Sequence, residues 1–132
     1  MKYMLDSNIC IYIMNERPKH ILDKFRTLSE CDVSISSVVL SELNYGAHKS
    51  HHKEKNLVAL EKFTVPVQAV SYDAQAASHF GEIRVALERQ GLVIGPYDLM
   101  IAAHALSVNA TLITNNLKEF SRVKNLRCEK WS

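Results

Sequence analysis

Short apolar segments alternate with segments of helical periodicity along this 132-residue chain. Helical stretches between successive strands require crossover connections, which favour a parallel sheet covered on both faces. We therefore expect a single α/β domain over residues 1–132, with the architecture of a three-layer α/β/α sandwich. The expected strands are Tyr3 to Leu5, an alternating strand Val33 to Ser36, Val65 to Val70 with Pro66 favouring an edge, Thr111 to Thr114 and a weak Leu126 to Cys128.

Helices are predicted where apolar residues recur three and four positions apart and where capping residues precede them. The expected helices run from Ser7 or Asn8 through Ile13, from Pro18 through Leu28, from Ser36 or Ser37 through Ala47, from the end of a polar loop (His48 to Lys53) through Phe63, from Asp73 to Gly91 and from Tyr97 to about Leu106. Asn115 and Asn116 are expected to form a turn.

Asp6 lies where the first predicted strand meets the first predicted helix. In parallel α/β sheets, ligands bind outside the carboxyl ends of the strands, so Asp6 is expected at a binding rim. Asp is also a preferred helix cap, and taken alone Asp6 could serve only that purpose.

Two further acids occupy apolar helical stripes. Asp98 begins a nearly wholly apolar helix, where the helix dipole also favours an acid. An unpaired buried carboxylate is costly, so a buried acid is expected to be neutral, paired or bound to metal. The simpler alternative for Glu42 is the margin of an apolar face. Its neighbours on the same stripe are Val38, Val39, Tyr45 and Gly46, none of them charged.

The segment from Thr114 to Phe120 follows a predicted strand and adds one more acid, Glu119. Thr114 and Asn116 are expected to emerge on the same rim as Asp6. Acids that converge without Lys or Arg repel one another unless a cation joins them, and hard oxygen ligands suit Mg²⁺ or Mn²⁺. Such ions activate water for phosphodiester hydrolysis.

Composition and charge fit this hypothesis without proving it. The chain is 47% hydrophobic with a net charge of +2, from 16 basic and 14 acidic residues. If four carboxylates share one pocket, the exterior is basic and suits a polyanion. Three cysteines without a Cys-x-x-Cys pair suggest neither a disulfide framework nor zinc. No long apolar run or signal peptide is evident, so a cytoplasmic protein without a membrane segment is expected.

Four motifs occur in a fixed order: Met4 to Asn8, Ser36 to Gly46, Gly95 to Ala105 and Thr114 to Phe120. Together they resemble the motifs of PIN-domain ribonucleases, specifically the VapC toxins of bacterial VapBC toxin–antitoxin modules. The resemblance implies five parallel strands in the order 3-2-1-4-5. It also implies a catalytic, metal-binding set of Asp6, Asp98, Glu42 and Glu119, with Ser7, Asn8, Thr114 and Asn116 in support. Asn116 stands where many members carry Asp, which leaves Asn116 and Glu119 as alternatives for the fourth position.

The resemblance further implies a Mg²⁺-dependent endoribonuclease toxin, with Mn²⁺ as a possible substitute. Its substrate would be structured RNA, such as an rRNA loop or a tRNA, with initiator tRNA the first choice. Hydrolysis by metal-activated water would leave 5′-phosphate and 3′-hydroxyl ends. A homodimer is implied, inhibited by a VapB antitoxin in a heterotetramer or larger assembly. Promoter DNA would be bound only through the antitoxin.

Other interpretations remain open at this stage. An aspartyl-phosphate phosphatase needs a second acid where this chain has Asn8, and a catalytically impaired PIN-like module would only bind RNA or protein. Tyr45 and Tyr97 either stack on a base or pack in the core. Three histidines have helix-like metal spacing, although neighbouring lysines favour a solvated segment: His48, His51 and His52.

Overall fold

A five-stranded parallel sheet forms the centre of the protein, described by a computed structural model for residues 2–131. Its strand order is β3-β2-β1-β4-β5, as predicted, and every neighbouring pair is parallel. The strands are β1 (Tyr3–Leu5), β2 (Val33–Ser36), β3 (Gln68–Val70), β4 (Thr111–Ile113) and β5 (Cys128–Glu129).

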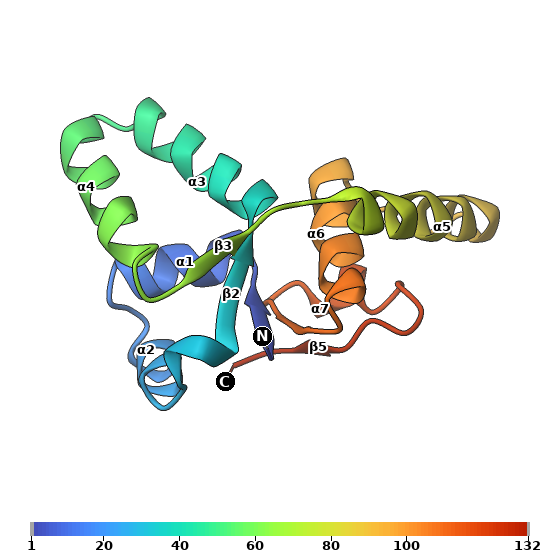
Figure 1. Ribbon diagram of the computed structural model, residues 1–132, viewed down its shortest axis with the longest axis horizontal. Coiled ribbons are helices and arrows are strands. Elements are labelled where there is room, and N and C mark those ends of the chain that lie inside the picture. Colours follow the sequence, from blue (N-terminus) through green and yellow to red (C-terminus); the bar gives the residue numbers. More distant parts are fainter. Residues whose placement is uncertain (1, 132) are drawn as a thin grey trace.

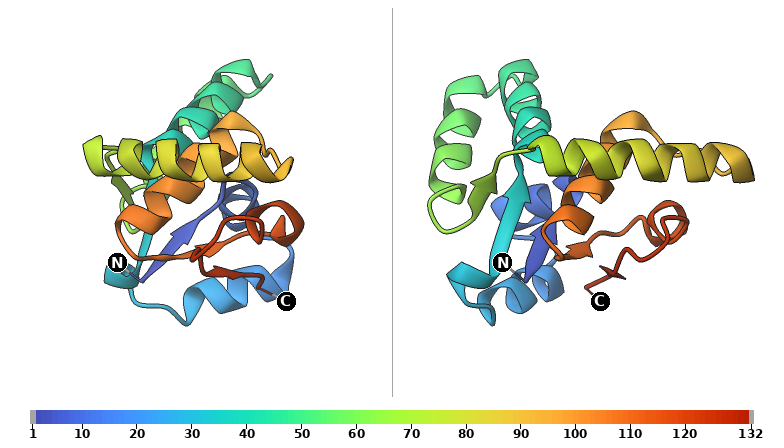
Figure 2. Two further views of the ribbon diagram at one scale, coloured as in Figure 1. Left: turned by 90° about the vertical axis from the view of Figure 1, so that its right-hand side faces the viewer. Right: turned by 45° about the vertical axis from the view of Figure 1, so that its right-hand side comes forward.

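Helices cover both faces of this sheet, which confirms the predicted three-layer sandwich. The helices α1 and α2 lie on one side, and α5, α6 and α7 lie on the other (Figures 1 and 2). The bounds are α1 (Ser7–Met14), α2 (Lys19–Arg26), α3 (Ser37–Lys49), α4 (Lys53–Phe63), α5 (Ala74–Gln90), α6 (Pro96–Ser107) and α7 (Leu117–Phe120), with a 3-10 turn at Glu30–Asp32. No helix within residues 2–131 has both the length and the apolar character needed to cross a membrane.

The core lies on both faces of the three central strands. Met4 and Leu5 of β1, Ile35 of β2, and Leu112 and Ile113 of β4 are fully buried. Helix α6 is apolar around most of its circumference because it is enclosed between the sheet and α5, and its residues 101–105 are buried. This burial confirms the prediction of an internal helix that begins with an acid.

Local sequence sets the helix starts and one helix end. Asp6, Ser36 and Asp73 each cap a helix by accepting a backbone N–H in the first turn. Gly91 ends α5 in the left-handed region, with φ of 68°, where a side chain would be strained. The first-helix cap is therefore Asp6 itself and not Ser7 or Asn8.

Several expected boundaries were wrong. All four residues of β2 are buried, so it does not alternate; a central parallel strand is covered on both faces and its serines find internal partners. Helix α3 continues through Lys49, which shortens the predicted polar loop. The third strand begins only at Gln68, at the sheet edge as expected, and the last strand is Cys128–Glu129. The short helix α7 was not predicted.

The carboxyl ends of β1, β2 and β4 meet at one rim of the sheet, because all strands run in the same direction. Helix α3 leaves β2 at this rim and pairs with α4 to form a hairpin that extends beyond the sheet (Figure 1). The starts of α1 and α3 and the residues after β4 therefore converge there, and that convergence positions the side chains described next.

Candidate active site

Asp6 is anchored at the carboxyl end of β1 and is only 7% exposed. Its Oδ1 accepts the Ser7 backbone N–H at 2.6 Å, and its Oδ2 accepts the Thr114 hydroxyl at 2.7 Å. Burial raises the pKa of Asp6, while these two hydrogen bonds act in the opposite direction. The side chain is thus fixed in place by one neighbour in sequence and one residue from the end of β4.

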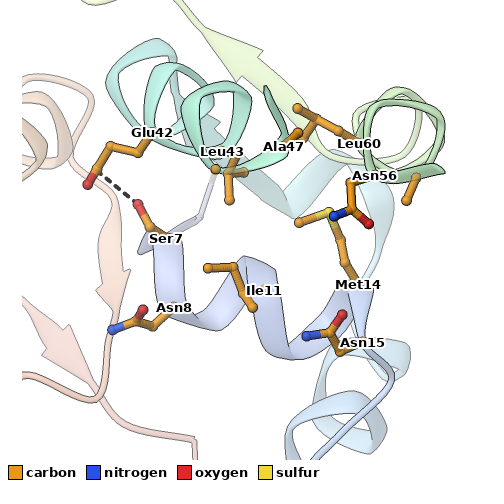
Figure 3. A pocket seen from close by; sticks show the side chains of 12 residues that line it. Ser7, Asn8, Ile11, Met14, Asn15, Glu42, Leu43, Ala47, Asn56 and Leu60 are labelled. Carbon is orange, nitrogen blue, oxygen red and sulfur yellow. Dashed lines mark hydrogen bonds between the residues drawn. The ribbon is translucent and has the colours of Figure 1, made fainter. Parts of the chain in front are cut away.

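Glu42 approaches the same rim from α3. The Ser7 hydroxyl donates to its Oε1 at 2.9 Å, as the dashed line in Figure 3 marks. Ser7 therefore connects two acids: its backbone N–H bonds to Asp6 and its side chain bonds to Glu42. Glu42 is partly buried, which is also compatible with the simpler alternative of an acid at the margin of an apolar face.

The segment after β4 brings Glu119 to the rim. The Thr114 hydroxyl, while donating to Asp6, accepts the Asn116 backbone N–H at 3.0 Å. The Asn116 side-chain amide then donates to Glu119 Oε2 at 3.2 Å. Asn116 thus orients the Glu119 carboxylate, and Glu119 carries the negative charge in this part of the site.

Asp98, in the first turn of α6, lies within electrostatic range of the other three acids. Its pKa is raised to about 6, first because burial disfavours the charged form and then because of the negative charges of Asp6, Glu119 and Glu42. Like charges gathered in a partly desolvated site repel one another. An added cation would relieve that repulsion.

No basic side chain of the described chain neutralises this cluster. Within residues 2–131 the sole salt bridge joins Arg84 and Glu88 on α5, away from the four acids. The oxygen donor set fits a hard divalent cation. In the observed side-chain positions, however, no three Asp, Glu, His or Cys residues between 2 and 131 are grouped tightly enough to hold an ion. Mg²⁺ is commonly held by one or two carboxylates, with water and substrate phosphate completing its coordination, so a cluster of three protein ligands is not a condition for binding.

A buried hydrogen bond between Ser36 and His104 connects the start of α3 to α6, the two helices that carry Glu42 and Asp98. The sequence did not predict this bond. His104 on α6 is 1% exposed, and its Nδ1 lies 2.7 Å from the Ser36 hydroxyl. The ring also meets the edge of Tyr72 at 5.7 Å between centroids. Burial lowers the pKa of His104. A polar residue inside an otherwise apolar helix was the available signal, and the bond fixes α6 against the start of α3.

The other residues singled out in the sequence are all exposed. Asn8 is exposed and makes no hydrogen bond to the four acids in the described structure. Tyr45 and Tyr97 are 66% and 61% exposed, so neither packs in the core. The three histidines near the α3–α4 turn are exposed and form no metal-binding group with other described residues: His48, His51 and His52.

A groove of about 410 Å³ opens beside the acids, between α1, α3 and α4. Ser7, Asn8 and the carboxylate of Glu42 lie at one end of it (Figure 3). The rest is lined by apolar side chains such as Ile11, Leu43 and Leu60, together with Asn15 and Asn56. A mainly apolar groove with a carboxylate at one end suits an amphipathic segment with a basic residue at one end. This groove was not predicted, because its lining comes from three separate helices.

Comparison with known proteins gives consistent matches over the whole chain. Residues 3–126 match the PIN domain family. The chain is 47% identical over 132 residues to the tRNA(fMet)-specific endonuclease VapC of Shigella flexneri, covering 100% of this chain and 99% of that protein. It is 45% identical over 132 residues to ribonuclease VapC2 of Rickettsia felis, covering 99% and 98%.

The fold matches equally well. The crystal structure of VapBC2 from Rickettsia felis, bound to a DNA fragment from its promoter, superposes with a TM-score of 0.93 at 44% identity, with 100% of both chains covered. Nuclease names among the similar proteins favour the enzyme interpretation over that of a catalytically impaired binding module.

The raised pKa of Asp98 predicts how stability depends on pH without divalent metal. The folded protein holds this proton up to about pH 6, whereas the unfolded chain releases it near 3.8. The folded state thus binds more protons in this interval, and the free energy of unfolding falls as pH rises through it. Asp98→Asn should lack this part of the decline. At pH 7.5 its free energy of unfolding should exceed that of wild type by about 1 kcal/mol, since solvent screens part of the effect at a partly exposed side chain.

Urea unfolding in EDTA at a series of pH values measures this difference. Asp23→Asn, an exposed acid on α2, is the matched control and should follow the wild-type curve. Parallel curves for wild type and Asp98→Asn would show that the pKa of Asp98 is not raised in the folded protein.

Proposed function

Because this chain belongs to the VapC ribonucleases of the PIN-domain family, we propose that it is a metal-dependent endoribonuclease toxin. Its substrate is structured RNA, with initiator tRNA the first candidate, as in the name of the Shigella flexneri relative. It acts as a single domain in the cytoplasm, where that RNA is found. The observation that carries the proposal is the group of four carboxylates without a basic partner at the rim of the sheet.

Asp6, Asp98, Glu42 and Glu119 are proposed to hold Mg²⁺, for which Mn²⁺ can substitute, because both ions prefer hard oxygen ligands. When bound, the cation neutralises charge on the scissile phosphate and activates a water molecule. Hydrolysis of the P–O3′ bond by water then leaves a 5′-phosphate and a 3′-hydroxyl.

The polar residues of the site have positioning roles in this proposal. Thr114 and the Ser7 backbone hold Asp6 in one orientation. The Ser7 hydroxyl holds Glu42, and the Asn116 amide holds Glu119. Hydrogen bonds of this kind keep the oxygens ready for a cation, so that less reorganisation is needed when substrate binds. Asn8, exposed beside Ser7, is proposed as a further supporting residue of the site.

We further propose that a VapB antitoxin inhibits this protein by occupying the groove between α1, α3 and α4. An apolar segment of the antitoxin fits the apolar lining, and an Arg at its end reaches the carboxylates next to Ser7 and Glu42. A guanidinium binds carboxylates bidentately and takes the place of the cation. The complex is proposed to be a heterotetramer or larger, built on a toxin homodimer, with promoter DNA bound through the antitoxin.

Antitoxin-free protein incubated with total tRNA tests the nuclease proposal. Cleavage is expected with Mg²⁺ and absent with EDTA, and Asp6→Asn should lower the rate at least about 100-fold because it removes a carboxylate that binds the cation. Asp23→Asn, on the exposed face of α2, should cleave at the wild-type rate. Cleavage that persists in EDTA or in Asp6→Asn would contradict the metal mechanism.

A charge placed in the groove tests the antitoxin proposal. Ile11 lines the groove and is 41% exposed, whereas Val58 on α4 is 51% exposed and lies outside the lining. Ile11→Asp should weaken binding of the antitoxin encoded by the adjacent reading frame at least about 10-fold, since it puts an unpaired charge in an apolar contact. Val58→Asp should change the affinity little. Equal affinities for both variants, measured by titration calorimetry, would exclude this groove.

A further inference from the structure

A stripe of three side chains on α3 leads away from the carboxylates. Glu42, Tyr45 and Lys49 are spaced three and four residues apart, so they share one face of the helix. Tyr45 is 66% exposed, and the Lys49 ammonium lies 5.7 Å from the centre of its ring. The stripe therefore presents a carboxylate, then an aromatic ring, then a cation.

Apart from the contact with Lys49, no interaction within the described residues explains Tyr45 as part of the packing. Among residues 2–131, its hydroxyl has no hydrogen-bond partner and its ring meets no other aromatic ring. A single exposed apolar residue is common on protein surfaces. Tyr45 differs because it stands one helical turn from an acid of the site and carries a cation at its ring. A ring held open to solvent in that setting is available to a ligand.

Apart from Glu42, which borders both, this stripe is separate from the groove. The α3 residues that line the groove beyond Glu42 are Leu43, Gly46 and Ala47, and neither Tyr45 nor Lys49 belongs to the lining. A peptide segment seated in the groove therefore leaves the ring uncovered. A chain that extends from the carboxylates along the exposed face of α3 meets the ring first and the ammonium next.

The spacing and chemistry of the stripe suit single-stranded RNA. Seven residues separate Glu42 from Lys49, which is about 10 Å along the helix axis, or about three nucleotide steps at a stacked rise of 3.4 Å. Aromatic rings stack on any base, and a lysine neutralises a phosphate. Further lysines continue beyond Lys49 at the start of α4, at Lys53 and Lys55, both exposed.

We propose that Tyr45 stacks on an unpaired base close to the scissile phosphate and that Lys49 binds a neighbouring phosphate. The inference rests on the proposed endoribonuclease function and adds to it the residues that hold the substrate strand. It also predicts that the preferred substrate has an unpaired loop, since a base inside a duplex cannot stack on a side chain.

Fluorescence of an anticodon stem–loop RNA tests the stacking directly. The probe carries 2-aminopurine at each loop position in turn and is titrated with protein in EDTA, so that it is bound without being cut. Wild type and Tyr45→Phe should quench at least one position. Tyr45→Ala should not quench that position and should bind about 10-fold more weakly, within the range found when stacking aromatics are removed.

Salt dependence tests Lys49. In Lys49→Gln the slope of log K against log salt should fall by about 0.7, the value for one phosphate contact on a single strand. Lys24→Gln is the matched control, because Lys24 is exposed on α2, away from the α3–α4 hairpin (Figure 1). Its slope should equal that of wild type.

The outcomes separate this inference from the proposed function. If wild type cleaves RNA with Mg²⁺ while Tyr45→Ala, shown to be folded by its thermal melt, quenches and binds like wild type, the stacking role is wrong and the nuclease stands. If wild type neither binds nor cleaves RNA, the proposed function fails and this inference with it. If Tyr45→Ala loses affinity for the antitoxin and keeps its affinity for RNA, the ring serves a protein interface and the inference is overturned.

Discussion

The hydrogen bond from the Thr114 hydroxyl to Asp6 is the contact on which the site depends. It joins the carboxyl ends of β1 and β4, which are adjacent strands although the two residues are 108 positions apart in sequence. Parallel pairing brings both ends to one rim, and the buried bond then fixes the orientation of a carboxylate that is 7% exposed. The Ser7 and Asn116 contacts extend this arrangement to Glu42 and Glu119.

The same arrangement stores electrostatic repulsion in the folded protein. Asp98 holds its proton to about pH 6 because burial and the surrounding acids disfavour its charge. A protein optimised only for stability would avoid such a group, so the unfavourable environment of Asp98 supports the proposal that this site binds a cation. In the function proposed above, either a divalent metal or an Arg of the antitoxin supplies the compensating positive charge. Competition between them for the same carboxylates would make the toxin inactive whenever the antitoxin is bound.

Much of the fold was predictable, because local signals and tertiary structure agree. The caps at Ser36 and Asp73 and the stop at Gly91 act through local contacts, and strands separated by helices imply a parallel sheet. Boundaries that depend on packing were not predictable. β2 is buried on both faces despite its alternating sequence, and its Ser36 bonds to His104, a partner that only the folded chain provides.

Part of the candidate site also has local signals in the sequence. Asp6, Glu42 and Asp98 stand out because each lies at a strand end or on an apolar stripe, although each also has a structural explanation and Asp6 does cap α1. The fourth position did not, since Asn116 is an ordinary turn residue and Glu119 belongs to a short helix that was not predicted. Their hydrogen bond, with the effect of Glu119 on the pKa of Asp98, favours Glu119 as the acid there. The apolar groove combines side chains from three helices and leaves no pattern in the sequence.

The central claim is that the acids at this rim bind a divalent cation. Anomalous diffraction from crystals of the protein soaked in Mn²⁺ tests it most directly. The account predicts an anomalous peak about 2.1 Å from carboxylate oxygens of Asp6 and Asp98, with Glu42 or Glu119 drawn toward it. A peak at the histidines of the α3–α4 turn, or none among these four acids at saturating Mn²⁺, would contradict it.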